Sequence, residues 1–139
     1  MFSPVRSDQY SVDYEFYDNG DKISMVFEHL AEHSLEEETG VYSVHYVRIR
    51  KNEKGFYSRI EDTTYNSENV FKFYKNVLEV SLHFCSNYDF KKVLIYGPSP
   101  KGETYDKKMR IYLKMLQKYS PKGLTFELKE GMIVVTKSV

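Results

Sequence analysis

The feature that most constrains the fold is a strict alternation of apolar and polar side chains on both sides of one Asn-Gly pair. Residues 22–30 place Ile23, Met25 and Phe27 on one face, which predicts a half-buried strand. Between this run and the one before it, Asn19-Gly20 accepts the positive φ angles that a tight hairpin turn requires. The preceding run, residues 9–17, has the same period, with these side chains on one face: Tyr10, Val12, Tyr14 and Phe16.

Two further predicted strands extend this hairpin. Residues 41–51 are rich in β-branched and aromatic side chains, which favour extended structure. The polar segment 52–55 contains a glycine and turns the chain into a shorter run, residues 56–61. We therefore expect residues 9–61 to form a four-strand antiparallel meander.

After this meander the apolar period changes from two residues to about 3.6, which indicates helices. Asn66 or Ser67 can cap the first helix, which we expect over residues 67–86. A second helix is predicted over residues 104–119 and ends before Pro121. Its expected inward side chains are Tyr105, Met109, Tyr112, Leu113 and Leu116.

Short strands surround the second helix. Residues 93–96 read as a buried strand, and residues 124–128 and 132–136 read as a final hairpin around Glu130-Gly131. The order ββββ-α-β-α-ββ predicts an α+β fold, in which two helices pack on one mostly antiparallel sheet. Residues 1–139 contain no repeat or linker and are expected to form a single domain, with residues 1–8 as a loose tail.

The composition favours a small soluble protein of the cytoplasm. Cys85 is the single cysteine, so no internal disulfide can form, which fits a reducing compartment. Residues 1–8 lack the apolar core of a secretory signal. A membrane helix needs about 20 apolar residues, and no apolar run in the sequence approaches this length, so we expect no membrane association.

Charge is separated along the chain although the net charge is zero. Residues 1–70 carry 7 basic and 14 acidic side chains, a net of −7, and residues 71–139 carry 13 basic and 6 acidic side chains, a net of +7. Such an asymmetry hints at an interaction surface. The 13 tyrosines are spread along the whole chain, which favours compositional bias over a tyrosine-rich binding face.

The order of these segments resembles that of a loose group of short, stand-alone bacterial or phage proteins of unknown function. The shared pieces are an N-terminal meander, a helix, a strand that ends in a polar loop, and a basic amphipathic helix. Here they correspond to residues 10–61, 67–86, 91–102 and 104–119. The resemblance covers most of the chain and rests on this pattern, and it implies no activity and no site residue.

The segment Gly97-Pro-Ser-Pro-Lys-Gly-Glu-Thr104 comes close to a phosphate-binding loop between a strand and a helix. However, Glu103 occupies the position of the phosphate-binding lysine, and two prolines lack the N–H groups that such a loop points at its anion. These departures exclude a nucleotide-hydrolysing loop and favour a stiff turn. A weaker anion site remains as an alternative, at the start of the helix, with Ser99, Lys101 and Thr104.

Four basic side chains share the outer face of the second predicted helix: Lys107, Arg110, Lys114 and Lys118. Such a row can follow a nucleic-acid backbone, with tyrosines available to stack on bases. Only one of the four is arginine, which forms the better fork for phosphate, and the chain has no net positive charge. An ordinary solvated helix face is therefore the favoured interpretation.

The histidines and the cysteine do not have the spacing of a metal site. On a helix, His83 and Cys85 point about 160° apart, away from any common ligand. Zinc binding and a Cys–His nucleophile pair are therefore both disfavoured. Cys85 falls on the apolar stripe of the first helix and is expected to be an inert core thiol. We expect no metal, no cofactor and no catalytic residue.

Two classes of function remain. The first hypothesis is a non-catalytic module that binds a protein partner or a second copy of itself. By analogy with the short bacterial or phage proteins that the chain resembles, such a module would have an accessory role in a mobile element or in phage–host conflict. The alternative is binding of nucleic acid, a nucleotide or an anion through residues 97–104 and the basic helix 104–119. An enzyme ranks last, because it would need a cleft that gathers His45, carboxylates and tyrosines.

Overall fold

The observed strands and helices follow the hydrophobic periods of the sequence. The computed structural model describes residues 2–8, 10–18, 20–30, 40–60, 70–96, 103–120 and 123–137. The fold belongs to the α+β class, as predicted, with a mostly antiparallel sheet and two helices. In chain order the elements are β1 (Arg6–Ser7), β2 (Ser11–Asp18), β3 (Asp21–His29), β4 (Val41–Lys51), β5 (Tyr57–Ile60), α1 (Val70–Asn87), β6 (Lys92–Tyr96), α2 (Glu103–Tyr119), β7 (Leu124–Lys129) and β8 (Met132–Lys137).

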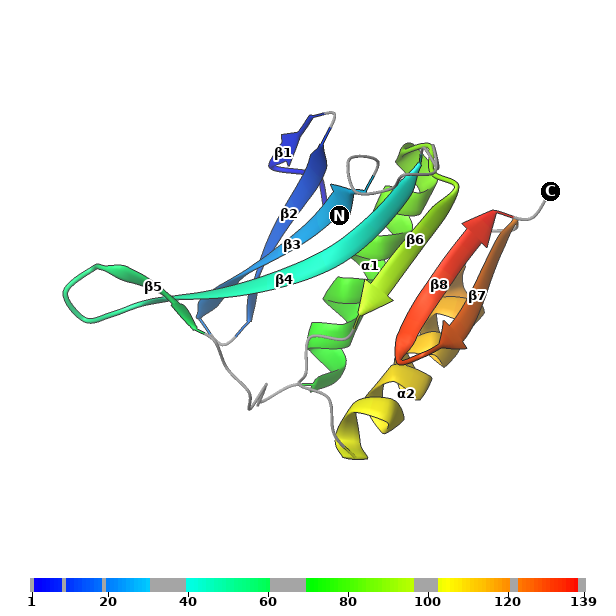
Figure 1. The fold of residues 1–139 in the computed structure, drawn as a ribbon. Coiled ribbons are helices and arrows are strands. Elements are labelled where there is room, and N and C mark those ends of the chain that lie inside the picture. Colours follow the sequence, from blue (N-terminus) through cyan, green and yellow to red (C-terminus); the bar gives the residue numbers. More distant parts are fainter. Residues whose placement is uncertain are drawn as a thin grey trace.

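All of the described strands belong to one sheet. Their order is β1-β2-β3-β4-β6-β8-β7, and β5 lies off this path, paired with β4. Neighbouring strands run antiparallel except β4 and β6, which are parallel, with Val44 opposite Ile95. Both helices pack on the same face of the sheet (Figure 1). Within the described part of the chain, no helix covers the opposite face, which we call the open face.

The core lies between the sheet and the two helices. Phe84 of α1 stacks on Phe27 of β3, with ring centroids 4.1 Å apart, and also contacts the ring of Tyr42. Burying a side chain of this size contributes about 1.5–3 kcal/mol to stability. On the other side of the layer, α2 contributes Met109, Tyr112 and Leu116, all fully buried. Many of the aromatic residues that the sequence scatters along the chain therefore meet in one layer.

Gly40 lies where the N-terminal meander meets the C-terminal strands. Its φ angle is 87°, a left-handed conformation that favours glycine. Its carbonyl accepts hydrogen bonds from the backbone N–H groups of Lys91 and Lys92 at 2.8 and 3.2 Å. A Cβ atom on Gly40 would lie 3.0 Å from the Lys91 nitrogen, closer than such contacts normally come. A glycine here therefore lets β4 and β6 start side by side.

Residues 2–8 differ from the predicted loose tail. Arg6–Ser7 pairs with β2 as strand β1, and the ring of Phe2 packs edge-on against Phe16, with centroids 6.0 Å apart. The carboxylate of Asp8 accepts backbone N–H bonds from Tyr10 and Ser11 at 2.8 and 2.9 Å, which shapes the turn into β2. A two-residue strand shows no readable period, so the sequence could not reveal it.

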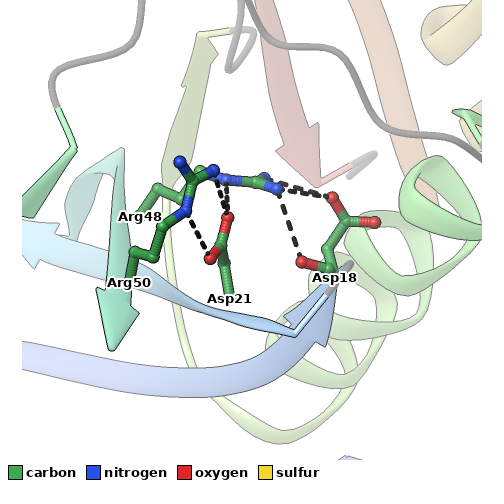
Figure 2. A network of polar contacts seen from close by, with 4 residues as sticks. All are labelled: Asp18, Asp21, Arg48 and Arg50. Carbon is green, nitrogen blue, oxygen red and sulfur yellow. Dashed lines mark hydrogen bonds and ion pairs between the residues drawn. The ribbon is translucent and has the colours of Figure 1, made fainter. Parts of the chain in front are cut away.

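Four charged side chains form a network where β4 runs past the β2–β3 hairpin, and Figure 2 shows Arg48 between two carboxylates. Arg48 donates to Asp21 at 2.7 Å and to Asp18 at 3.1 Å. Arg50 donates to both carboxylate oxygens of Asp21, each at 3.0 Å. The side chains of Arg48, Asp18 and Asp21 are 10%, 7% and 5% exposed. The network therefore fixes the path of β4 at this end of the sheet.

The close approach at Gly40 predicts a difference between two glycine substitutions. Gly40→Ala and Gly20→Ala both place alanine at a positive φ, which costs about 1 kcal/mol. No atom lies within 4 Å of a Cβ built on Gly20, whereas a Cβ on Gly40 meets the Lys91 backbone. We expect Gly40→Ala to lower the free energy of unfolding by about 1 kcal/mol more than Gly20→Ala. Urea unfolding measures both values, and equal losses would contradict the steric argument.

The ion network predicts a loss of stability in acid. Hydrogen bonds from Arg50, together with those from Arg48, lower the pKa of Asp21 below its ordinary value of 3.8, against the opposing effect of burial. A lowered folded-state pKa stabilises the protein above the unfolded-state value, and this contribution is lost as the pH falls through the folded-state value. Asp21→Asn should therefore cost about 3 kcal/mol at pH 7, because Arg48 loses a buried partner.

The pH series supplies the specific readout for Asp21. The difference in free energy of unfolding between the wild type and Asp21→Asn should begin to narrow below about pH 4, where Asp21 becomes protonated in the unfolded chain, and should close as the pH falls through the lower folded-state pKa. Asp89→Asn is the control, because the carboxylate of Asp89 is fully exposed where it pairs with Lys137. A difference that stays constant from pH 7 to the acid limit would show that Asp21 does not stabilise the fold through its charge.

Candidate binding groove between the helices

A buried hydrogen bond fixes how α1 and α2 lie against each other. The Ser81 hydroxyl donates to the Val77 carbonyl at 2.8 Å, so its oxygen is left to accept from the Tyr112 hydroxyl at 2.7 Å. Ser81 and Tyr112 are both almost completely buried. A buried polar group without a partner costs about 1–3 kcal/mol, so the bond selects one alignment of the helices.

A groove of about 430 Å³ lies between the two helices. Apolar side chains form most of its surface. Lys75 and Glu79 also line it, and the Lys75 ammonium lies 4.0 Å from the Glu79 carboxylate. Its volume falls in the range of known ligand and peptide sites. The lining residues are Lys75, Leu78, Glu79, Leu82, Met115 and Tyr119.

The spacing of the lining residues explains why the groove is apolar. Leu78 and Leu82 are four residues apart on α1, and Met115 and Tyr119 are four apart on α2. Residues at this spacing lie above one another on the same side of a helix. Each helix therefore presents two apolar side chains, one turn apart, to the groove. Leu82 is half-buried at the surface of α1, where it packs against the edge of the core.

A second hollow, of about 500 Å³, continues from the groove across α1 and shares Glu79 and Leu82 with it. His83 lies in this hollow, and its Nδ1 atom is 2.8 Å from the Tyr14 hydroxyl. Burial raises the pKa of Tyr14 far above its ordinary value of 10, so the hydroxyl keeps its proton, and the tautomer of His83 decides which of the two atoms donates.

The contacts of His83 do not form a catalytic arrangement. Ser86 and Glu79 line the same hollow, but within the described residues neither of them makes a hydrogen bond to His83. A nucleophile needs a base within hydrogen-bond reach, and the base needs an orienting group. The contacts of His83 are instead a hydrogen bond between its Nδ1 atom and Tyr14 and an edge-on packing of its ring against the Tyr14 ring.

The basic residues predicted for one face of α2 lie next to the groove. All four are exposed: Lys107, Arg110, Lys114 and Lys118. At about 100° per residue, Lys118 lies about 60° around the helix from Met115, and Lys114 about 100°. The Lys118 ammonium is 5.3 Å from the ring centroid of Tyr119, which lines the groove. The structure thus joins a predicted basic face to an apolar groove that the sequence analysis had missed.

The other residues of the predicted anion site cannot be placed in the same way. Ser99 and Lys101 lie outside the described residues, and Thr104 belongs to the first turn of α2. In the described ranges, no group of three or more His, Cys, Asp and Glu side chains could hold a metal ion. None of the helices in these ranges has the length and apolar character needed to cross a membrane.

Comparison with protein-family models, with curated proteins and with solved structures finds no significant match to this chain. No relative therefore assigns an activity to any of its residues. A function has to follow from the groove, from the charges around it and from the reactivity of the side chains nearby.

Cys85 provides a direct check on that reactivity. It is buried on α1, and burial raises the pKa of its thiol from 9.0 to about 12. The native protein should therefore hold about a thousandfold less thiolate than an exposed cysteine does. We expect a chromogenic disulfide reagent to label native Cys85 at least about 100-fold more slowly than the unfolded chain. The doubly substituted protein Cys85→Ser, Ser86→Cys is the control, because Ser86 is exposed, and equal labelling rates would contradict the inert assignment.

Proposed function

We propose that this protein is a non-catalytic binding module that holds an acidic, amphipathic segment of a partner protein in the groove between α1 and α2. The observation that carries this proposal is the solvent-accessible apolar groove bordered by the basic face of α2. An accessory role in a mobile element or in phage–host conflict would suit such a module, because it would act by occupying another protein.

The geometry of the groove supports a helical partner segment. Helix-in-groove recognition uses apolar anchors at positions i, i+3, i+4 and i+7 of the incoming helix. Leu78 and Leu82 form one wall of the groove, and Met115 and Tyr119 form the other, each pair one helical turn apart. Methionine adapts its shape to a partner, and tyrosine gives a large contact area for little loss of side-chain entropy.

The charges around the groove support an acidic partner. Among the lining residues that the structure describes, Glu79 is the one acidic side chain, and it already pairs with Lys75. The adjoining face of α2 adds four exposed basic side chains: Lys107, Arg110, Lys114 and Lys118. Complementary charge accelerates association and repels partners of the wrong sign. A nucleic acid on the basic face alone would leave the apolar groove without a role.

A designed peptide tests this proposal. The probe is a fluorescein-labelled helical peptide with leucine on one face and glutamate on the other, and its lysine counterpart is the reference. We expect the acidic peptide to bind and the basic one not to bind. Met115→Glu should weaken binding about 30-fold, the effect of losing a central anchor of about 2 kcal/mol.

Met132→Glu is the matched control for Met115→Glu. Both methionines are half-buried, but Met132 lies on the open face of the sheet, away from the groove. Circular dichroism establishes that each variant is folded. The combined substitutions Lys107→Glu, Lys114→Glu and Lys118→Glu should weaken binding and reduce its salt dependence. Equal binding by Met115→Glu and the wild type would show that the groove is not the site.

A further inference from the structure

A second surface has a different chemistry from the groove. β4 pairs with β3 as far as Ile49, which lies opposite Lys22, and then continues to Lys51 in pairing with β5. Residues 48–60 thus form a two-stranded ribbon, which we call the arm. Figure 1 shows the arm extending beyond the β2–β3 hairpin and standing clear of both helices.

The arm is held in a defined direction although no described helix or strand packs over it. Its base carries Arg48 and Arg50, which are tied to Asp18 and Asp21 (Figure 2). At its tip, the Asn52 side-chain oxygen accepts backbone N–H bonds from Lys54 and Phe56 at 3.0 and 2.9 Å. An ordered ribbon loses little conformational entropy when it binds a ligand.

Large aromatic rings are exposed on and beside the arm. Phe56, Tyr57 and Tyr17 are 68%, 66% and 68% exposed. The register places Tyr17, Lys22 and Ile49 side by side on the open face, because their neighbours Phe16 and Ile23 point into the core.

The next row outward on the open face again combines a ring with a basic group. Lys51 lies two residues after Ile49 and is paired with Tyr57. Its ammonium is 5.7 Å from the centroid of the Tyr57 ring. Lys22 also contacts Glu15, at 3.6 Å, so the inner row is partly neutralised and the outer row is the more basic.

The charge of the arm is opposite to that of the half of the chain around it. Residues 48–60 contain five basic side chains and one acidic one, Glu53, whereas residues 1–70 carry a net charge of −7. Arg48 and Arg50 are matched to Asp18 and Asp21. The sequence of the arm then holds three further basic residues for its one acidic residue: Lys51, Lys54 and Arg59.

We infer that the arm, together with Tyr17 and Lys22 beside it on the open face, binds single-stranded nucleic acid. Exposed rings give platforms on which unpaired bases stack, and lysines between them neutralise the phosphates. Rings that alternate with cations match a chain of bases and phosphates better than they match a continuous apolar surface. This activity lies on a different face from the groove and is separate from the partner binding proposed for it.

The test uses fluorescein-labelled oligonucleotides of about 12 nucleotides, oligo-uridine and oligo-thymidine, at two salt concentrations. We expect salt-sensitive anisotropy changes, and Tyr57→Ala should weaken binding about tenfold, the effect of losing one stacked base. Lys51→Glu with Lys54→Glu should weaken it further and flatten the salt dependence. Tyr119→Ala on α2 is the matched control, because Tyr119 is also an exposed tyrosine but lies away from the arm. It should leave oligonucleotide binding unchanged.

Three results would overturn the inference. One is equal oligonucleotide affinity of the wild type and Tyr57→Ala, which would show that no base stacks on Tyr57. Another is loss of oligonucleotide binding on charge reversal of Lys107 and Lys114 but not of Lys51 and Lys54, which would move the site to α2. The third is binding to anionic lipid vesicles without binding to oligonucleotides. Tyr57→Ala should leave binding of the acidic peptide intact, so the two proposals fail separately.

Discussion

The structure depends on β4, which has three pairing partners. The eleven-residue strand pairs with β3 along most of its length, with β6 at its start and with β5 at its end. The parallel pairing with β6 joins the N-terminal meander to the C-terminal strands, and Gly40 permits the close approach there. At the other end, Arg48 and the carboxylates of Asp18 and Asp21 hold the strand where it leaves the hairpin. Both ends of β4 therefore rely on specific local contacts.

Packing both helices on one face of the sheet has two consequences for function. The outer sides of α1 and α2 form a groove, and the opposite face of the sheet stays uncovered in the described part of the chain (Figure 1). The groove presents apolar side chains beside lysines, whereas the arm presents separated rings and cations. A protein segment in the groove and a nucleic acid on the arm would occupy different faces, so one would not displace the other.

Much of the fold could be predicted from the sequence because its signals are local. The strand predicted over residues 41–51 coincides with β4, β2 and β3 pair as a hairpin as far as Asp18 and Asp21, and both helices are where the periods place them. Strand order could not be predicted, because pairing between β4 and β6 joins residues far apart in the chain. The groove could not be predicted, because a helical apolar period does not show whether another part of the protein covers a side chain such as Leu82. The arm could not be predicted either, because only the register of the strand pairs shows that β4 extends beyond the end of β3.

The most direct test of the groove is to map peptide binding residue by residue with amide chemical shifts of the ¹⁵N-labelled protein. The acidic amphipathic peptide is added to saturation, and shifts are recorded for the helices, the open face and the arm. We expect the largest changes on residues 75–86 of α1 and 111–119 of α2, and small changes on residues 50–58. Changes centred on the arm or on the open face of the sheet, or none at saturating peptide, would show that the peptide does not bind in the groove.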